Sequence, residues 1–147
     1  MEYKRSKSKV EDLLKHFLIT KNDFIPPLDG TVDLNKYSQK ILDNAVRFEC
    51  WSGDILVGLI AIYLNNFQTK VGYITSVSVS GSYKGKGIAK KMLNDCFDFA
   101  QRKGFKEIKL EVNKNNKNAI ALYKKFKFIK FDTNEDLDLM KLVLKNI

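Results

Sequence analysis

The sequence predicts one α/β (α+β) domain, spanning residues 1–147, with a mixed central sheet flanked by helices on both faces. A chain of 147 residues has the usual length of a single domain, and no repeat, low-complexity tract or linker divides it. Helical periodicity dominates the first third of the chain, and strand patterns that alternate with helix patterns follow. A strand, a crossover helix and a further strand in the middle of the chain indicate a mixed sheet that is covered on both sides.

Two helices are predicted in the first third. Ser8-Lys9-Val10-Glu11 has the spacing of a capping box, so a helix is expected to follow through about Thr20. Two prolines make Phe24–Gly30 a loop, because proline lacks the backbone donor that regular structure needs. Asp33 is the expected cap of a second helix, which ends near Ala45.

Alternating apolar residues predict the strands of the sheet, and Gly53-Asp54 predicts a hairpin turn between the second and the third. The expected strands cover Tyr3–Arg5, Val46–Ser52, Ile55–Leu64, Tyr73–Ser80, Lys106–Val112, Phe128–Phe131 and Leu137–Leu144. An amphipathic helix is expected from near Gly87 to Lys103-Gly104, and a shorter one from Asn118 to about Phe126.

The composition limits the classes of binding partner expected for this chain. Lys and Arg exceed Asp and Glu by 26 to 17, and the net charge of +9 suits nucleic acid, anionic lipid or a phosphorylated small molecule. Aromatic residues do not interleave with lysines on one strand, and no recognition-helix motif is present, so no nucleic-acid partner is expected. The longest apolar run, Ile55–Leu64, is too short for a membrane span, and no apolar segment follows the basic N-terminus. We therefore expect a cytoplasmic protein without a membrane partner.

Metal-ligating residues are sparse. The two cysteines, Cys50 and Cys96, are far apart in sequence, and His16 is the one histidine of the chain. A zinc site needs more nitrogen and sulfur ligands than these, so no metal site is predicted.

A glycine-rich turn, VSGSYKGKGIAK over Val79–Lys90, joins a strand to the amphipathic helix. Glycines allow several backbone N–H groups to converge, and the dipole of the helix favours an anion at this end. The lysines at 84, 86, 90 and 91 add positive charge. The turn matches neither a Walker A loop nor GxGxxG. It predicts a pyrophosphate-binding site; the alternative is an ordinary glycine-rich turn beside a solvated lysine face.

Within this turn, Lys84-Gly85-Lys86-Gly87-Ile88-Ala89 resembles the [Q/R]-x-x-G-x-[G/A] motif that opens the central helix of GNAT acetyltransferases. Lys84 stands where Gln or Arg is usual. The resemblance implies a GNAT-like, mostly antiparallel sheet and acetyl-CoA as co-substrate. It also implies that the preceding strand binds the pantetheine arm through its main chain. The cofactor-binding residues expected here are Val77, Val79, Lys84, Gly85, Lys86, Gly87, Ile88, Ala89 and Lys90.

A second stretch, Leu110–Phe128, resembles the GNAT pattern L-x-V…N-x-x-A-x-x-L-Y-x-x-x-G-F. By this resemblance Asn116 contacts the cofactor and Tyr123 lies near its sulfur. Lys127 replaces the usual glycine, and a positive φ at a lysine costs roughly 1 kcal/mol unless the helix ends differently.

Acetyl transfer to an amine needs a base for the amine and stabilisation of the thioester oxygen, and the departing thiolate benefits from a nearby acid. Tyr123 is the candidate acid, although a helix aromatic at this position also suits a core. Glu111 is the candidate base. The motif L-E-V…N-x-x-A-I-x-L-Y is similar to that of bacterial ribosomal-protein alanine N-acetyltransferases, where the matching Glu serves as base. Three alternatives to Glu111 as base remain. Glu111 could instead pair with neighbouring lysines, Glu49 could be the base, or a base could act through water.

The resemblance says little about the acceptor, because it covers the cofactor half of the chain. A surface of +9 repels basic peptide tails, so we expect a small-molecule amine such as an amino sugar. A protein N-terminus is the alternative, as is a module that binds acetyl-CoA without turnover. The strand Leu137–Leu144 suits either a homodimer interface or the chain's own sheet.

Overall fold

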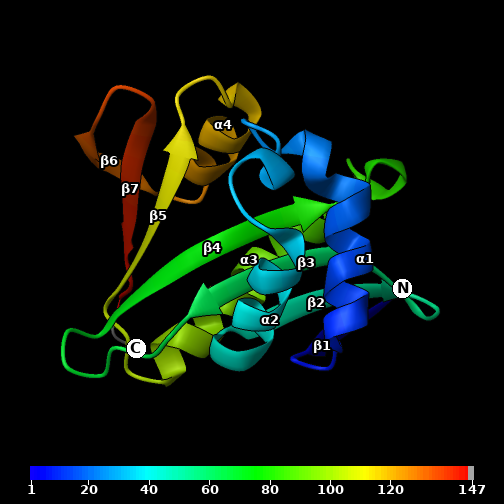
Figure 1. Ribbon diagram of the computed structural model, residues 1–147. Coiled ribbons are helices and arrows are strands. Elements are labelled where there is room, and N and C mark those ends of the chain that lie inside the picture. Colours follow the sequence, from blue (N-terminus) through cyan, green and yellow to red (C-terminus); the bar gives the residue numbers. More distant parts are fainter. Residues whose placement is uncertain (146–147) are drawn as a thin grey trace.

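Seven strands form one sheet in the computed structural model, which describes residues 1–145. They lie side by side in the order β1-β2-β3-β4-β5-β7-β6 (Figure 1). The strands are β1 (Glu2–Arg5), β2 (Val46–Ser52), β3 (Ile55–Tyr63), β4 (Val71–Val79), β5 (Glu107–Asn113), β6 (Ile129–Thr133) and β7 (Leu137–Val143). Neighbouring strands are antiparallel except for β4 and β5, which run parallel. The predicted fold class, a mixed and mostly antiparallel sheet, is confirmed.

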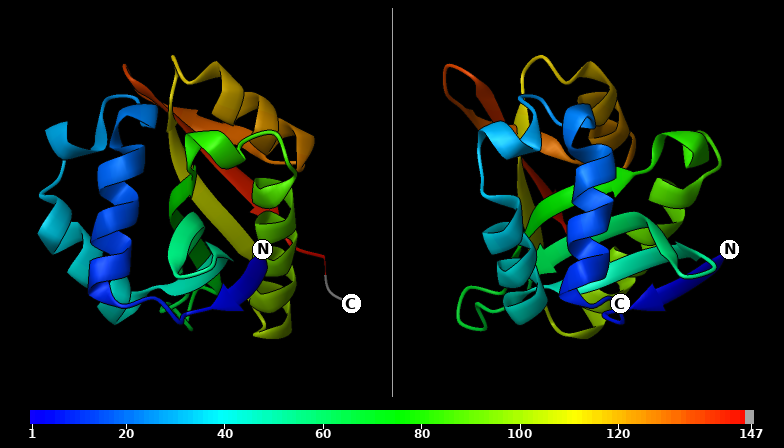
Figure 2. Two further views of the ribbon diagram at one scale, coloured as in Figure 1. Left: turned by 90° about the vertical axis from the view of Figure 1, so that its right-hand side faces the viewer. Right: turned by 45° about the vertical axis from the view of Figure 1, so that its right-hand side comes forward.

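Helices cover both faces of the sheet, as Figure 2 shows most clearly in its left view. The α-helices are α1 (Val10–Thr20), α2 (Leu34–Asn44), α3 (Ile88–Arg102) and α4 (Lys117–Lys125), and the short 3-10 turns are η1 (Lys21–Asp23), η2 (Leu28–Gly30) and η3 (Gly81–Tyr83). α1 and α2 lie on one face, and α3 and α4 lie on the other (Figure 2). Each predicted helix is found within a few residues of its expected bounds.

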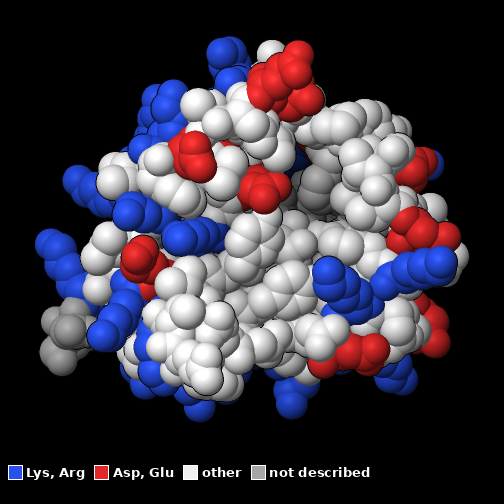
Figure 3. Space-filling view, turned by 60° about the vertical axis from the view of Figure 1, so that its left-hand side comes forward, with Lys and Arg blue, Asp and Glu red and all other residues white. Residues whose placement is uncertain are grey.

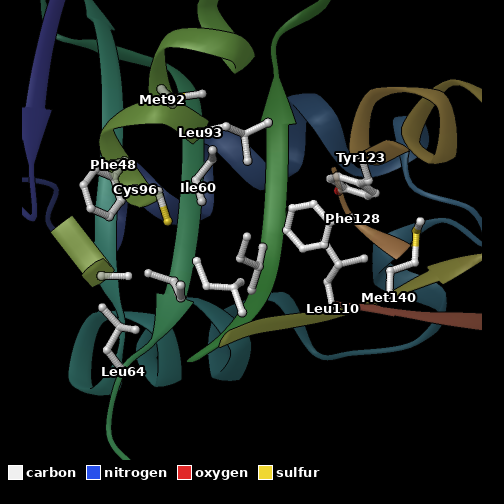
Figure 4. Close-up of a cluster of buried hydrophobic side chains, with 14 of the residues drawn as sticks. Phe48, Ile60, Leu64, Met92, Leu93, Cys96, Leu110, Tyr123, Phe128 and Met140 are labelled. Atoms are coloured by element: carbon white, nitrogen blue, oxygen red, sulfur yellow. The ribbon is translucent and has the colours of Figure 1, made fainter. Parts of the chain in front are cut away.

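The two faces of the sheet hold separate hydrophobic cores. The larger core joins α3, α4 and five strands around Leu93, Ile60 and Phe128 (Figure 4). The smaller core joins α1 and α2 to β2 and β3 around Phe17 and Leu59. β5, β6 and β7 have one face on the side of α3 and α4 and another on the side of α1 and α2. The residues of these strands that belong to a core all lie on the side of α3 and α4. Their face on the side of α1 and α2 therefore carries no helix.

A β-bulge interrupts β4. Ile62 of β3 pairs with Ile74, whereas its neighbour Ala61 pairs with Ser76, so Thr75 is an extra residue in β4. A bulge shifts the alternation of side chains by one position. Ile74 and Val77 therefore face the same core, although they are three positions apart.

The N-terminus of α1 differs from the prediction. Lys9, rather than Ser8, is the capping residue, and its backbone N–H donates to the carboxylate of Asp12 at 2.9 Å. The capping box expected at Ser8 and Glu11 is therefore wrong by one position. The hydroxyl of Ser8 instead donates to the buried carboxylate of Glu49, a partner 41 residues away that local spacing does not reveal.

The predicted cap of α2 and the predicted last strand are both found. Asp33 caps α2 by accepting a hydrogen bond from the backbone N–H of Lys36 at 3.0 Å. The last predicted strand, β7, pairs with β5 and β6 of its own sheet. Of the two alternatives for this strand, completion of the chain's own sheet is the one observed.

Lys127 follows α4 with φ of +76°, the left-handed conformation that glycine adopts without strain. We expect Lys127→Gly to stabilise the fold by about 1 kcal/mol, because the clash between Cβ and carbonyl oxygen disappears. This corresponds to a rise in Tm of roughly 3 °C for a chain of this size. Thermal unfolding of the variant beside Lys125→Gly, which removes a side chain with normal helical φ, measures it. A Lys127→Gly variant that is destabilised as much as Lys125→Gly contradicts the strain.

Candidate active site

The site begins where β4 and β5 part. Their parallel ladder ends after three pairs, the last of which joins Tyr73 to Lys109. Beyond this point the two strands fan out, as Figure 1 shows. Backbone N–H and C=O groups on the edge of β4 that would otherwise pair with β5 therefore have no partner strand. The fold thereby opens the sheet next to the bulge.

A cavity of about 290 Å³ fills the opening. Its walls come from β4, from the end of β5, from the start of α4 and from the loop after α1. The residues that line it are Asp23, Phe24, Ile25, residues 74–79, Lys84, residues 110–113, Asn116, Asn118, Ala119 and Tyr123. Glu111 and Tyr123, the candidate base and acid, thus line the same cavity.

A second cavity of about 310 Å³ lies over the glycine-rich turn. It shares Val77, Ser78, Val79 and Lys84 with the first cavity, so the two form one groove along β4. Gly85 and Gly87 both have φ of +77°, which lets the chain turn into α3 without strain. The first turn of a helix leaves N–H groups without carbonyl partners, and the positive end of its dipole lies there. An elongated ligand with a phosphate at one end, such as acetyl-CoA, fits this groove.

The predicted cofactor-binding residues are not equivalent in the structure. Ile88 lines the second cavity and also belongs to the larger core, where the residue is 3% exposed. Lys86 lies outside the lining of both cavities, with its ammonium 5.5 Å from the ring centroid of Tyr83. Lys84 forms an exposed ion pair with Asp23 at 3.1 Å, which links the turn to η1. Among the lysines, 84 and 90 line the groove.

Asn116 caps α4 and lines the first cavity. Its Oδ1 accepts a hydrogen bond from the backbone N–H of Ala119 at 3.2 Å. Since this oxygen is occupied by the cap, a ligand would meet the Nδ2 group of the same amide. The local fold therefore explains why an asparagine suits this position, whatever the ligand.

Tyr123 belongs both to the cavity and to the core. Its side chain is 8% exposed, and its ring lies 5.7 Å from that of Phe128 (Figure 4). Burial raises the pKa of Tyr123 above its usual range, so the phenol is protonated at neutral pH. A thiolate, whose ordinary thiol pKa is about 8.5, does not readily take a proton from such a phenol. Tyr123 can, however, donate a hydrogen bond to a thiolate.

Glu111 stands on β5 two positions after the ladder with β4 ends, and its side chain is exposed. Burial and then the negative charge of Glu111 raise the pKa of Tyr73 to about 12. The two side chains are thus close enough to interact across the parting strands. Sequence reasoning missed Tyr73, and its position at the end of the parallel ladder is a signal that only the paired strands provide.

Glu49, the other candidate base, is not in either cavity. Its carboxylate is buried and accepts hydrogen bonds from the backbone of Lys7 and Ser8, the Ser8 hydroxyl and the indole of Trp51, and it pairs with Arg47 at 3.3 Å. These contacts fasten the segment before α1 to β2. The structure therefore contradicts a role for Glu49 as base.

His16 lies beneath the groove. Since the carbonyl of Leu56 can only accept, His16 Nδ1–H donates to it at 3.0 Å, and the Ser78 hydroxyl donates to Nε2 at 2.8 Å. Burial lowers the pKa of His16 to about 4. Both ring nitrogens are therefore occupied, and His16 supports β4 rather than serving as a base.

Two further contributors come from the N-terminal helices and loops, in which the sequence offered Tyr37 and Phe24–Gly30 without matching them to a substrate. Tyr37 of α2 donates a hydrogen bond to the bulge carbonyl of Thr75 at 2.8 Å and so holds the bulge in place. Phe24 and Ile25, from the proline-containing loop, also line the first cavity. The space-filling view shows a hollowed face with Asp and Glu at its rim and Lys and Arg farther out (Figure 3).

Membrane and metal features are absent from residues 1–145 as described. No helix there is long and apolar enough to cross a bilayer. Within the same residues no three His, Cys, Asp or Glu side chains are placed to share a metal ion.

PaiA N-acetyltransferase from Thermoplasma acidophilum, solved in complex with coenzyme A, shares the fold with a TM-score of 0.77 over 97% of this chain and 99% of that one, at 17% identity. The chain belongs to the acetyltransferase (GNAT) family, whose model matches residues 13–128. Enzymes of this family use acetyl-CoA as co-substrate.

Two curated relatives match parts of the chain. A probable N-acetyltransferase san from Drosophila melanogaster is 36% identical over 84 residues, which are 56% of this chain and 46% of the relative. N-alpha-acetyltransferase 30 from Saccharomyces cerevisiae is 41% identical over 59 residues, 40% of this chain and 34% of the relative. The chain thus spans less than half the length of either relative.

Proposed function

We propose that this protein transfers the acetyl group of acetyl-CoA directly to a primary amine, and that the acceptor is a small molecule such as an amino sugar. The observation that carries the proposal is the shared cavity. A carboxylate, Glu111, and a protonated phenol, Tyr123, line one space that continues into the groove over the glycine-rich turn.

In the proposed reaction the backbone of Val77 and Val79 and the turn around Gly87 position acetyl-CoA, with lysines 84 and 90 near its phosphates. Glu111 accepts a proton from the acceptor ammonium, directly or through water, which frees the lone pair of the amine. The amine attacks the thioester carbon, so a C–N bond forms and the C–S bond breaks, and the second proton that the nitrogen loses passes through solvent to the departing thiolate. Tyr123 donates a hydrogen bond to the sulfur as negative charge develops on it. No covalent intermediate on the protein is needed, because both reactants share one cavity.

Glu111→Gln tests the base. We expect kcat/KM to fall by about 100-fold with loss of the rise in rate with pH, because glutamine cannot accept the proton. Thiol release from acetyl-CoA is followed with a panel of amino sugars, amino acids, polyamines and N-terminal peptides. Glu107→Gln is the matched control, since Glu107 lies on the same strand but outside both cavities. Equal rates for both variants would leave water, rather than Glu111, as the base.

A protein N-terminus is the second candidate acceptor. The match to N-alpha-acetyltransferase 30 of yeast favours it. The panel separates the two acceptors: selective acetylation of peptides would replace the small-molecule proposal, and transfer to amino sugars but not to peptides would support it. Binding of acetyl-CoA without turnover on any amine would instead indicate a binding module.

A further inference from the structure

The half-sheet of β5, β7 and β6 presents an uncovered face beside the proposed site. Ile108 and Leu110 of β5 and Met140 of β7 pack into the larger core on the side of α3 and α4. Because side chains alternate along a strand, Lys109 and Lys141 point to the opposite face. No helix packs on that face, as the separate left-hand strands of Figure 1 show.

Two lysines oppose each other on this face. Lys109 of β5 and Lys141 of β7 are directly paired across the antiparallel ladder. Their ammonium groups lie 5.0 Å and 5.6 Å from the centroid of the same ring, that of Phe131. Among the described residues, neither ammonium has a carboxylate within ion-pair distance.

Such an arrangement has an electrostatic cost. Like charges directly opposite each other destabilise a sheet, and the face of one aromatic ring offsets this only in part. An anion between the two ammonium groups would remove the repulsion. The partly exposed Phe131 holds both lysine chains against the sheet, so little side-chain entropy remains to be lost when an anion binds.

The lysine pair continues the proposed site. Lys109 precedes Glu111 by two residues on the same strand face, a separation of about 7 Å along the strand. Lys109 is also the last residue of β5 that pairs with β4. Its partner in β4 is Tyr73, which lies beside Glu111. Glu111 is paired with Leu139, the residue of β7 two positions before Lys141. A carboxylate and a pair of cations are thus aligned on one exposed surface.

We propose that Lys109 and Lys141 bind an anionic group of the acceptor, a phosphate or a carboxylate, while its amine lies at Glu111. The inference rests on the proposed acetyl transfer and defines its substrate class: an amine that carries an anion about 7 Å away. An amino sugar phosphate and a peptide with an acidic side chain near its N-terminus both provide this chemistry. Neutral and polycationic amines do not.

Two matched pairs of acceptors test the preference for an anion and distinguish a phosphate from a carboxylate. They are glucosamine 6-phosphate against glucosamine, and the C-terminally amidated peptide Ala-Asp-Ala against amidated Ala-Asn-Ala. We expect kcat/KM to favour the anionic member of at least one pair by about tenfold or more. Lys109→Gln/Lys141→Gln should abolish the preference. Lys130→Gln, which removes one charge from β6 at the partner position of core-facing Met140, should retain it. Equal kcat/KM within both pairs, or a preference that survives in the double variant, overturns the inference while acetyl transfer stands.

A binding measurement tests the anion site even if none of the amines is acetylated. Inorganic phosphate is titrated into the protein saturated with acetyl-CoA, so that the groove over the glycine-rich turn is already filled, and amide resonances are followed by NMR. Saturable shifts at residues 109, 131 and 141 that disappear in the double variant support the anion site even if no amine is acetylated, a result that would count against the proposed function alone. Absence of these shifts in the unmodified protein overturns the inference.

Discussion

Tyr123→Phe should lower kcat for acetyl transfer by about 100-fold and leave the fold intact. The substitution removes one hydroxyl from a ring whose packing against Phe128 and the core remains. A lost hydrogen bond to a developing charge typically costs 100-fold or more, which corresponds to about 2.7 kcal/mol of activation free energy. Steady-state thiol release at saturating acetyl-CoA measures the effect, with Tm as the check on folding.

The control for Tyr123 is Tyr3→Phe, because Tyr3 lies on the edge strand β1 and outside the groove. We expect its kcat to equal that of the unmodified protein. The KM for acetyl-CoA in Tyr123→Phe should change little, since the hydroxyl acts on the departing sulfur rather than on the bound thioester. Unchanged kcat in Tyr123→Phe would show that the ring serves only to fill the core.

Glu49→Ala should destabilise the fold by about 3–5 kcal/mol, because it leaves the guanidinium of Arg47 buried without its carboxylate. It also removes the acceptor of four further hydrogen bonds that tie Lys7, Ser8 and Trp51 together. The expected loss of Tm is roughly 10 °C.

Glu111→Ala is the matched control for this prediction, since its carboxylate is exposed. It should melt close to the unmodified protein and lose activity, whereas Glu49→Ala should lose stability and keep its kcat below its melting temperature. A Glu49→Ala variant with normal Tm and no activity would contradict this prediction and support Glu49 as the base.

Local sequence patterns predicted the elements of this fold well. Alternation located β4 and β5, and the turn at Gly53-Asp54 located the hairpin of β2 and β3. Asp33 and Gly87 marked the starts of two helices because their chemistry acts within one turn. The capping box at Ser8 failed for the opposite reason: its hydroxyl is used by a carboxylate 41 residues away. The motif left two possibilities open at Lys127, a positive φ or a different end of the helix, and the structure shows the positive φ.

The groove over the glycine-rich turn could be located from the sequence because one contiguous turn and one strand form most of it. The proposed acceptor side could not be assembled from the sequence, because Tyr73 and Lys141 reach it through the pairing of distant strands. The bulge at Thr75 leaves a trace in the sequence, since Ile74 and Val77 are three apart rather than two. The net charge of the whole chain argued only against basic peptide tails as acceptors, whereas the pairing of β5 with β7 locates a specific pair of cations.

The most direct test of the central claim follows the acetyl carbon itself. The protein is mixed with acetyl-CoA labelled with carbon-13 at the carbonyl and with glucosamine 6-phosphate, and the label is followed by NMR. Conversion of the thioester signal to an amide signal on the sugar, in the unmodified protein and about 100-fold more slowly in Tyr123→Phe, is the predicted result. A thioester signal that persists with this acceptor and with every other amine of the panel would contradict acetyl transfer by this chain.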